Sequence, residues 1–265
     1  MILNLMRKVF YNRNMKQYCL VIFVAIFSIN LSAFSDPTIY YLKNGTTVAI
    51  VNDPAATVAS SYVFVRTGSI FEGDWIGSGV SHYLEHLLAG GTTSKKSEDE
   101  YRNIIDGLGG AYNAYTTYDH TAYYIHSSAK NVSVALETLF EWMYYGRWTN
   151  QEFKREKGVI LKEMDRANNN MSRKIYQKSQ SLFYKDSPYK YPVIGYQDIF
   201  NKISNDDLIN YYKQQYVPEN MIIVVGGAVS ENIILNQMES TFGSKAVKAP
   251  PLRYVGSNRN IISSV

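Results

Sequence analysis

The residues with the clearest chemical potential lie in the heptapeptide from Ser81 to Leu87. The chain has four histidines among 265 residues, and two of them, His82 and His86, are four positions apart here. On an α-helix this spacing turns the two side chains only about 40° from each other and places Glu85 about 60° to the other side of His82. Both imidazoles can then reach one zinc ion at about 2.0–2.1 Å, with the carboxylate beside it. The alternative is a helix on which both histidines only cap or line a core.

Two histidines leave a catalytic zinc ion without its usual third protein ligand. A predicted helix that begins near Asn150 offers three glutamates, Glu152, Glu156 and Glu163, which share one face within about 40°. On an ordinary helix such a stripe faces solvent. Beside an incomplete metal site, we expect this face to supply the missing ligand, although the spacing does not choose among the three.

Other candidate ligands are few. Cys19 is the only cysteine and lies near the N-terminus, so a metal held by the rest of the chain needs His, Asp or Glu ligands. His120 and His126 lie on a predicted hairpin, where we expect them to have structural roles. One zinc ion per chain is therefore the expected metal content.

The N-terminal 35 residues are typical of an export signal. A basic region that ends at Lys16 precedes the apolar run from Cys19 to Phe27, and Ala33 and Ser35 have the spacing that signal peptidase accepts. The run is shorter than the roughly 20 residues of a transmembrane helix, although an uncleaved membrane anchor is the alternative. We predict a signal peptide over residues 1–35 and export, to a bacterial periplasm because the remainder contains no cysteine.

The charge of the remaining chain excludes one class of partner. From Asp36 onward the basic and acidic residues balance, and no basic cluster predicts nucleic-acid binding. With 46% hydrophobic residues, the chain can build a proper hydrophobic core. We predict one domain over residues 36–245, followed by a linker or tail over residues 246–265 that contains Pro250 and Pro251.

Strands and helices alternate along this domain. Asn44-Gly45 predicts a hairpin, Gly79 and Gly90 bracket a short helix that carries His82, and Ser97 begins a helix through a capping box. The predicted strands cover residues 39–53 as a hairpin, 59–66, 111–127 as a second hairpin, and 221–225. The predicted helices cover residues 80–89, 97–108, 132–143, one long helix from 150 into the 180s, 205–216 and 230–242. This order predicts an α+β fold with helices packed against a largely antiparallel β-sheet.

The residues around the motif His82-x-x-Glu85-His86 resemble the pitrilysin/insulinase family of zinc peptidases, in which H-E-x-x-H is inverted to H-x-x-E-H. The resemblance covers about residues 39–245. It is carried by Gly79-Val80-Ser81, Leu87-Leu88-Ala89-Gly90-Gly91-Thr92, Ser97-Glu98-Asp99-Glu100-Tyr101, Gly109-Gly110, Asn113-Ala114-Tyr115-Thr116, Thr121-Ala122-Tyr123, Glu156-(x)6-Glu163 and Tyr216-Val217-Pro218-Glu219-Asn220-Met221.

This resemblance implies a role for each site residue within a pitrilysin-type metallopeptidase domain. Glu163 becomes the third metal ligand, Glu156 orients a histidine or tunes the metal, and Glu152 stays on the surface. Glu85 acts as the general base on a water molecule activated by zinc and then passes the proton to the leaving amine.

The resemblance also implies a substrate site and a partner. Asn113, Ala114 and Tyr115 form a sheet edge with which an extended peptide pairs, the alternative being an ordinary edge strand. In this family a second, similar domain or subunit contributes an Arg and a Tyr that hold substrate, and no residue before Val265 can be assigned these roles. The expected function is a zinc endopeptidase acting on peptides or unfolded segments, completed by a partner. The alternatives are a truncated or non-catalytic subunit and a zinc-stabilised structural protein.

Overall fold

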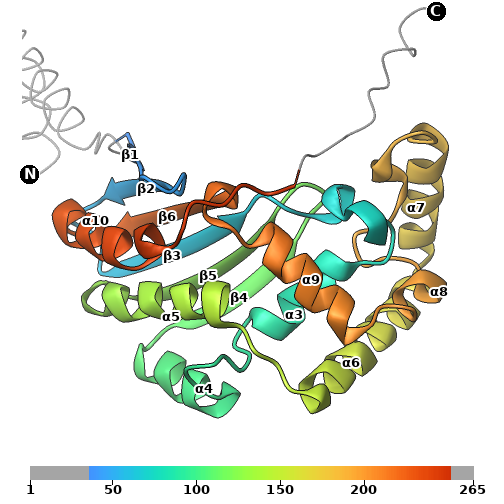
Figure 1. Cartoon of the computed structure of the whole chain (residues 1–265), viewed down its shortest axis with the longest axis horizontal. Helices are drawn as coiled ribbons and strands as arrows, with labels where there is room; N and C mark the ends of the chain where they lie inside the picture. The colour runs from blue at the N-terminus through green and yellow to red at the C-terminus, as the bar shows by residue number, and fades with distance from the viewer. Residues whose placement is uncertain (1–35, 252–265) are drawn as a thin grey trace, which may run out of the picture. The chain divides into compact units, whose positions relative to one another are not determined.

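A six-stranded sheet organises residues 36–251, the part of the chain that the computed structural model describes (Figure 1). In spatial order the strands are β1 (Thr38–Tyr41), β2 (Thr47–Asn52), β6 (Met221–Gly227), β3 (Val58–Val65), β5 (Thr121–Ser128) and β4 (Ala111–Thr116). All neighbouring pairs are antiparallel except β2 and β6. The predicted signal peptide and most of the predicted tail lie outside the described residues.

The side chains of β3 alternate between a buried and a half-buried face of the sheet. Val63 and Val65 are buried on one face, whereas Tyr62 is half-buried on the other and stacks on Tyr124 of β5 with 4.8 Å between ring centroids. Branched and aromatic side chains fit such a pleated surface well. The last strand of the sheet, β4, has β5 as its neighbour on one side and forms an edge on the other.

Helices cover the buried face of this sheet. In Figure 1, α5 (Val132–Tyr145) and α10 (Glu231–Ser240) lie along it, and both contact its strands. Next to them, α3 (Val80–Leu88) packs against α9 (Asn205–Gln215) and against β4. The helices α4 (Glu98–Gly107), α6 (Asn150–Asn168), α7 (Met171–Phe183) and α8 (Gln197–Phe200) complete the described part. The predicted α+β class is confirmed.

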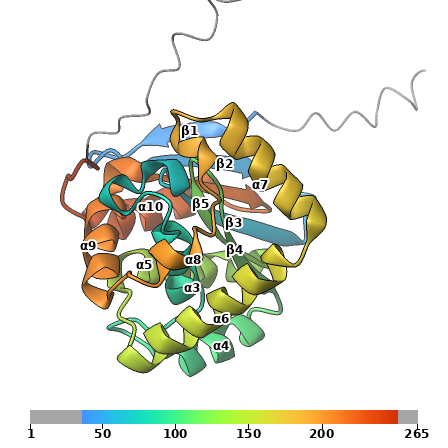
Figure 2. The ribbon, with the colours of Figure 1, turned by 90° about the vertical axis from the view of Figure 1, so that its right-hand side faces the viewer.

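The single long helix predicted from residue 150 into the 180s is wrong, because α6 ends at Asn168 and α7 begins at Met171. Asparagine side chains compete for backbone groups and weaken a helix interior. Here the Asn170 side chain accepts a hydrogen bond from the Arg173 N–H (3.0 Å) and caps a new helix. As a result, α7 leaves the end of α6 in a different direction (Figures 1 and 2). The short helix α8 was also not predicted.

Among residues 36–251, no helix combines the length and the apolar character needed to cross a lipid bilayer.

Candidate metal centre

The start of α3 is held by an unusual buried carboxyl group. Gly79 caps the helix with a left-handed backbone (φ 75°), and a Cβ at this position would overlap the carbonyl oxygen of Ile194. Glu72 accepts hydrogen bonds from Gly79 N–H (3.3 Å) and Ser81 N–H (3.1 Å), two donors that the first helical turn leaves free. Burial raises the pKa of Glu72 to about 8, against the lowering effect of these bonds.

Apolar contacts place α3 beside α6. Tyr83 and Leu84 of α3 are fully buried. The ring of Tyr83 stacks on Phe153 of α6 at 5.2 Å, and its hydroxyl group donates to the Phe153 carbonyl oxygen. Tyr83 therefore joins the two helices that carry the candidate ligands by both a ring contact and a hydrogen bond.

His82, His86 and Glu163 come together between these helices, with one donor atom from each within 4.8 Å of the others. The Glu163 carboxylate lies 3.8 Å from His82 Nε2 and 3.7 Å from His86 Nε2. Tetrahedral bonds of about 2.1 Å would place neighbouring donors about 3.4 Å apart, so small side-chain rotations suffice to close the set on one ion. Two imidazoles and one carboxylate suit a catalytic zinc ion, because they leave its fourth position open.

The hydrogen bonding of His86 also fits a metal ligand. Its Nδ1 lies 3.2 Å from Glu156 Oε2, which leaves Nε2 directed to Glu163. When Nδ1 donates to this carboxylate, the Nε2 lone pair is free for a metal, and the ring orientation is fixed. Burial opposes a charge on His86, but the bond to Glu156 and the nearby carboxylates raise its pKa. The structure thus places Glu156 beside His86.

His82 differs from His86 in its surroundings. Burial, with the neighbouring His86, lowers the pKa of His82 to about 3, so its imidazole is neutral. Its Nδ1 atom is buried without a hydrogen-bond partner among the described residues. A neutral imidazole is the form that binds a metal.

Glu85 points from α3 toward the edge strand. Thr116 Oγ1 of β4 donates to Glu85 Oε2 at 2.7 Å. Burial raises the pKa of Glu85, and Glu163 adds to this effect, although the bond from Thr116 opposes it. A carboxylate with a raised pKa, held by a single hydroxyl group, is suited to accept a proton.

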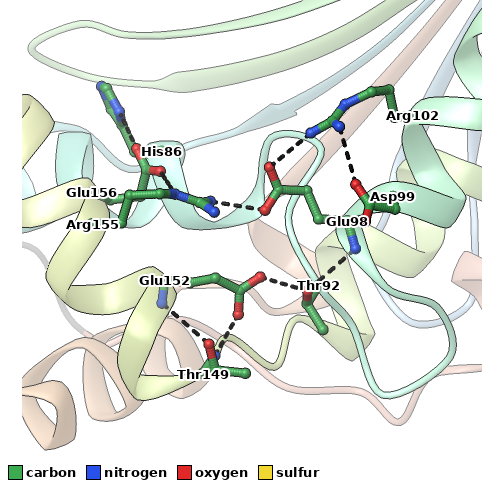
Figure 3. A network of polar contacts seen from close by, with 9 residues as sticks. All are labelled: His86, Thr92, Glu98, Asp99, Arg102, Thr149, Glu152, Arg155 and Glu156. Carbon is green, nitrogen blue, oxygen red and sulfur yellow. Dashed lines mark hydrogen bonds and ion pairs between the residues drawn. The ribbon is translucent and has the colours of Figure 1, made fainter.

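A cavity of about 500 Å³ opens beside these residues. Its wall includes Glu85, Glu98, Glu152, Glu156, Arg155 and the β4 residues Tyr112, Asn113 and Ala114, with His82 and Glu163 at one side. Arg155 lies between two of the carboxylates, because its Nε donates to Glu156 (2.8 Å) and its Nη2 donates to Glu98 (2.8 Å) (Figure 3). We call this the acidic cavity.

Glu152 is not the surface residue that was predicted, since only 8% of it is exposed. It completes a capping box with Thr149 at the start of α6 and accepts from Thr92 Oγ1 (Figure 3). This third glutamate of the predicted stripe therefore anchors α6. His120 hydrogen-bonds with Asp119 (2.8 Å) and His126 with Ser60 (2.9 Å), away from the ligand set.

The predicted substrate edge lies on β4, where Asn113, Ala114 and Tyr115 pair with Tyr124, Tyr123 and Ala122 of β5. Sequence reasoning assigned no role to three residues that support the site, Glu72, Arg155 and Thr116. Thr116 directly follows the predicted edge residues. Because side chains alternate between the two faces of a strand, this position could have been predicted to face α3. Glu72 and Arg155 support the site through tertiary contacts, which no local sequence pattern predicts.

A family model described as insulinase (peptidase family M16) matches residues 47–197, more than half of the chain. The chain belongs to the insulinase family. The resemblance predicted from the motifs is confirmed, and a second model, described as the peptidase M16 inactive domain, matches residues 202–261.

Members of the insulinase family similar to this chain include proteins named as zinc proteases and as a subunit. An uncharacterized zinc protease of Rickettsia felis is 29% identical over 221 residues, which cover 82% of this chain and 53% of the relative. A mitochondrial-processing peptidase subunit beta of Lentinula edodes is 29% identical, over 84% of this chain and 47% of the relative. The chain thus spans about half the length of these relatives.

Among solved structures, the first half of the periplasmic protease PqqL from Escherichia coli shares the fold with a TM-score of 0.75. It is 21% identical, and the match covers 84% of this chain and 49% of that chain. At this identity the similarity concerns the fold alone.

Proposed function

We propose that this insulinase-family chain is the zinc-bearing part of a metalloendopeptidase that hydrolyses peptides or unfolded protein segments. The observation that carries the proposal is the position of Glu85. It lies on the same helix as the ligand candidates His82 and His86, and Thr116 of the edge strand holds its carboxylate. A zinc-stabilised structural protein would have no use for a buried, proton-accepting carboxylate there.

His82, His86 and Glu163 would hold one zinc ion, which supplies polarisation of the peptide carbonyl and a lower pKa for water. Glu85 Oε2 or Oε1 takes the proton of the attacking water and delivers it to the nitrogen of the leaving amine. Glu156 keeps His86 in the tautomer that presents Nε2, through the contact at 3.2 Å.

The substrate would bind as an added strand on β4. Asn113, Ala114 and Tyr115 present an open sheet edge next to Glu85, because β5 occupies only the other side of the strand. Backbone hydrogen bonds to such an edge bind extended peptides with little dependence on sequence. The scissile bond would then lie between the edge and the ligand set.

The test compares the chain with its Glu85→Gln variant. We expect both proteins to bind one zinc ion, measured by atomic emission, and only the unmodified chain to cleave a quenched fluorescent peptide. A chain that binds zinc stoichiometrically and cleaves nothing, alone or with an added second half, contradicts the proposal.

A second candidate is a subunit that acts only when another chain completes it. This chain spans about half the length of its relatives, and one relative is named as a subunit. On this candidate, cleavage would appear only after a second insulinase-type domain is added, so the same assay separates the two.

We also propose export to a bacterial periplasm. The basic and apolar pattern of residues 1–35 supports this proposal. N-terminal sequencing of the protein recovered from a periplasmic extract tests it, because a signal cleaved after Ser35 leaves Asp36 as the first residue.

A further inference from the structure

We propose that a second cavity beside the ligand set is a subsite for an acidic side chain of the bound peptide. This inference rests on the proposed peptidase function, and it adds the chemical class of substrate. The cavity has a volume of about 800 Å³ and meets the acidic cavity at His82 and Glu163. We call it the basic cavity.

Three cationic side chains line the basic cavity, Arg166 at the end of α6, Arg173 on α7 and Lys190. Among the described residues, Glu163 is the only carboxylate in its wall, and this group belongs to the candidate ligand set. Within residues 36–251, none of the three cations forms an ion pair. The cavity therefore carries positive charge that the described residues do not neutralise.

Arginine is well suited to recognise a carboxylate, because its planar guanidinium donates two parallel hydrogen bonds to the two oxygens. A concave wall of one charge sign also strengthens the field inside it. A glutamate or aspartate side chain entering this cavity would gain partners, whereas a lysine side chain would meet like charge.

The course of β4 connects this cavity to the peptide edge. Tyr112, Asn113 and Ala114 line the acidic cavity, and Thr116 and Tyr118, farther along the chain, line the basic cavity. A peptide paired with β4 would therefore pass the ligand set and have side chains in both cavities, since strand residues advance about 3.3 Å each.

A buried acceptor adds to the polar wall. Gln180 lines the basic cavity, and its amide nitrogen donates to Tyr176. Its Oε1 atom is buried with no hydrogen-bond partner among the described residues. Because buried acceptors are normally hydrogen-bonded, this side chain adds polar capacity that the described residues do not satisfy.

The experiment measures peptide binding to the zinc-loaded Glu85→Gln chain by fluorescence anisotropy, so that hydrolysis does not interfere. The peptides are dye-labelled and share one sequence except at a single test position, which carries Glu, Gln or Lys. In successive sets of peptides, the test position moves along the sequence. At one or more positions we expect the Glu peptide to bind about fivefold more tightly than the Gln peptide, and the Lys peptide more weakly.

Two further variants assign the preference to this cavity. In the Arg166→Gln/Arg173→Gln chain we expect Glu and Gln peptides to bind equally. The matched control is Lys174→Gln. Lys174 is exposed and lies on α7 next to Arg173, but it does not line the cavity, so this variant should retain the preference for the Glu peptide. Thermal unfolding of each variant checks that the fold is intact.

The proposal is overturned if Glu gives no advantage at any position, or if the advantage survives in the double variant. If the Glu85→Gln chain binds Glu peptides preferentially but the unmodified chain cleaves no peptide, alone or with an added second half, the subsite stands and the peptidase proposal is removed. A chain that binds no peptide at all removes both.

Discussion

The acidic and the basic cavity are neighbours that share His82 and Glu163, yet they are built from opposite charges. The acidic cavity contains Glu85, Glu98, Glu152 and Glu156 against Arg155, apart from the shared residues. The basic cavity contains Arg166, Arg173 and Lys190 and no carboxylate of its own.

The break between α6 and α7 produces this difference. The first half of α6 supplies Glu152 and Glu156 to one cavity, and its last turn supplies Arg166 to the other. Because Asn170 starts a new helix, α7 can bring Arg173 to the same wall. The candidate metal site therefore lies between Glu152 and Glu156 on one side and Arg166 on the other, the residues of α6 that line the two cavities, and this arrangement would orient a peptide by its charged side chains.

The largest expected effect concerns Glu163, which with His82 forms the boundary between the two cavities. In the Glu163→Gln chain we expect zinc affinity to fall by more than about 100-fold, because a ligand is lost rather than an outer hydrogen bond. Competition with a chelating dye measures this affinity. Glu98→Gln is the matched control, since Glu98 lines the acidic cavity without joining the ligand set, and equal losses in both variants would contradict the assignment.

A smaller loss is expected on the acidic side alone. Glu156→Gln leaves His86 without its charged partner at 3.2 Å, and zinc affinity should fall about 10- to 100-fold. If Glu156→Gln abolishes zinc binding while Glu163→Gln preserves it, Glu156 is the metal ligand and Glu163 is not. The metal would then lie within the acidic cavity.

The helix that carries both histidines should respond to pH through Glu72. Burial raises the pKa of Glu72 from 4.5 to about 8, so in this interval the folded chain keeps a proton that the unfolded chain has released. The contribution of Glu72 to the free energy of unfolding is therefore largest below pH 4.5. It decreases by up to about 1.4 kcal/mol per pH unit as the pH rises toward 8.

Urea unfolding of the zinc-free chain at the two ends of this interval measures the effect. Glu72→Gln removes the titrating group and should make the pH dependence shallower than in the unmodified chain. Equal pH dependence in both proteins would show that Glu72 does not bind a proton on folding.

The smallest expected effect tests the acidic cavity as a counterpart of the basic one. Arg155→Gln removes the cation that Glu98 and Glu156 share, so a peptide carrying Lys should bind about two- to fivefold more tightly. Anisotropy at low salt measures this gain. Arg102→Gln, which also removes a partner of Glu98 but lies outside both cavities, is the control, and the same gain there would indicate a nonspecific charge effect.

The sequence was most informative where function depends on local spacing. His82, Glu85 and His86 could be placed together because the period of a helix projects them from one side. The hairpin at Asn44-Gly45 and the capping box at Ser97 and Glu100 were predicted correctly for the same reason, since each depends on neighbours a few residues apart. The α6–α7 break was missed because no Pro or Gly marks residues 168–171, and the next Pro in the chain is Pro188.

By itself, the amino-acid sequence determined the inverted zinc motif, the α+β class and the membership of the insulinase family. Only the tertiary structure decided that Glu152 anchors α6 instead of facing solvent, that Thr116 holds Glu85, and that Arg166, Arg173 and Lys190 line one cavity. Motifs depend on the geometry of one helix or turn, whereas charge in a cavity is summed over segments that become neighbours only when the chain folds. The helix from His82 to His86 supplies two residues of the candidate metal site, whereas the fold supplies the third candidate ligand and the opposite charges of the two neighbouring cavities.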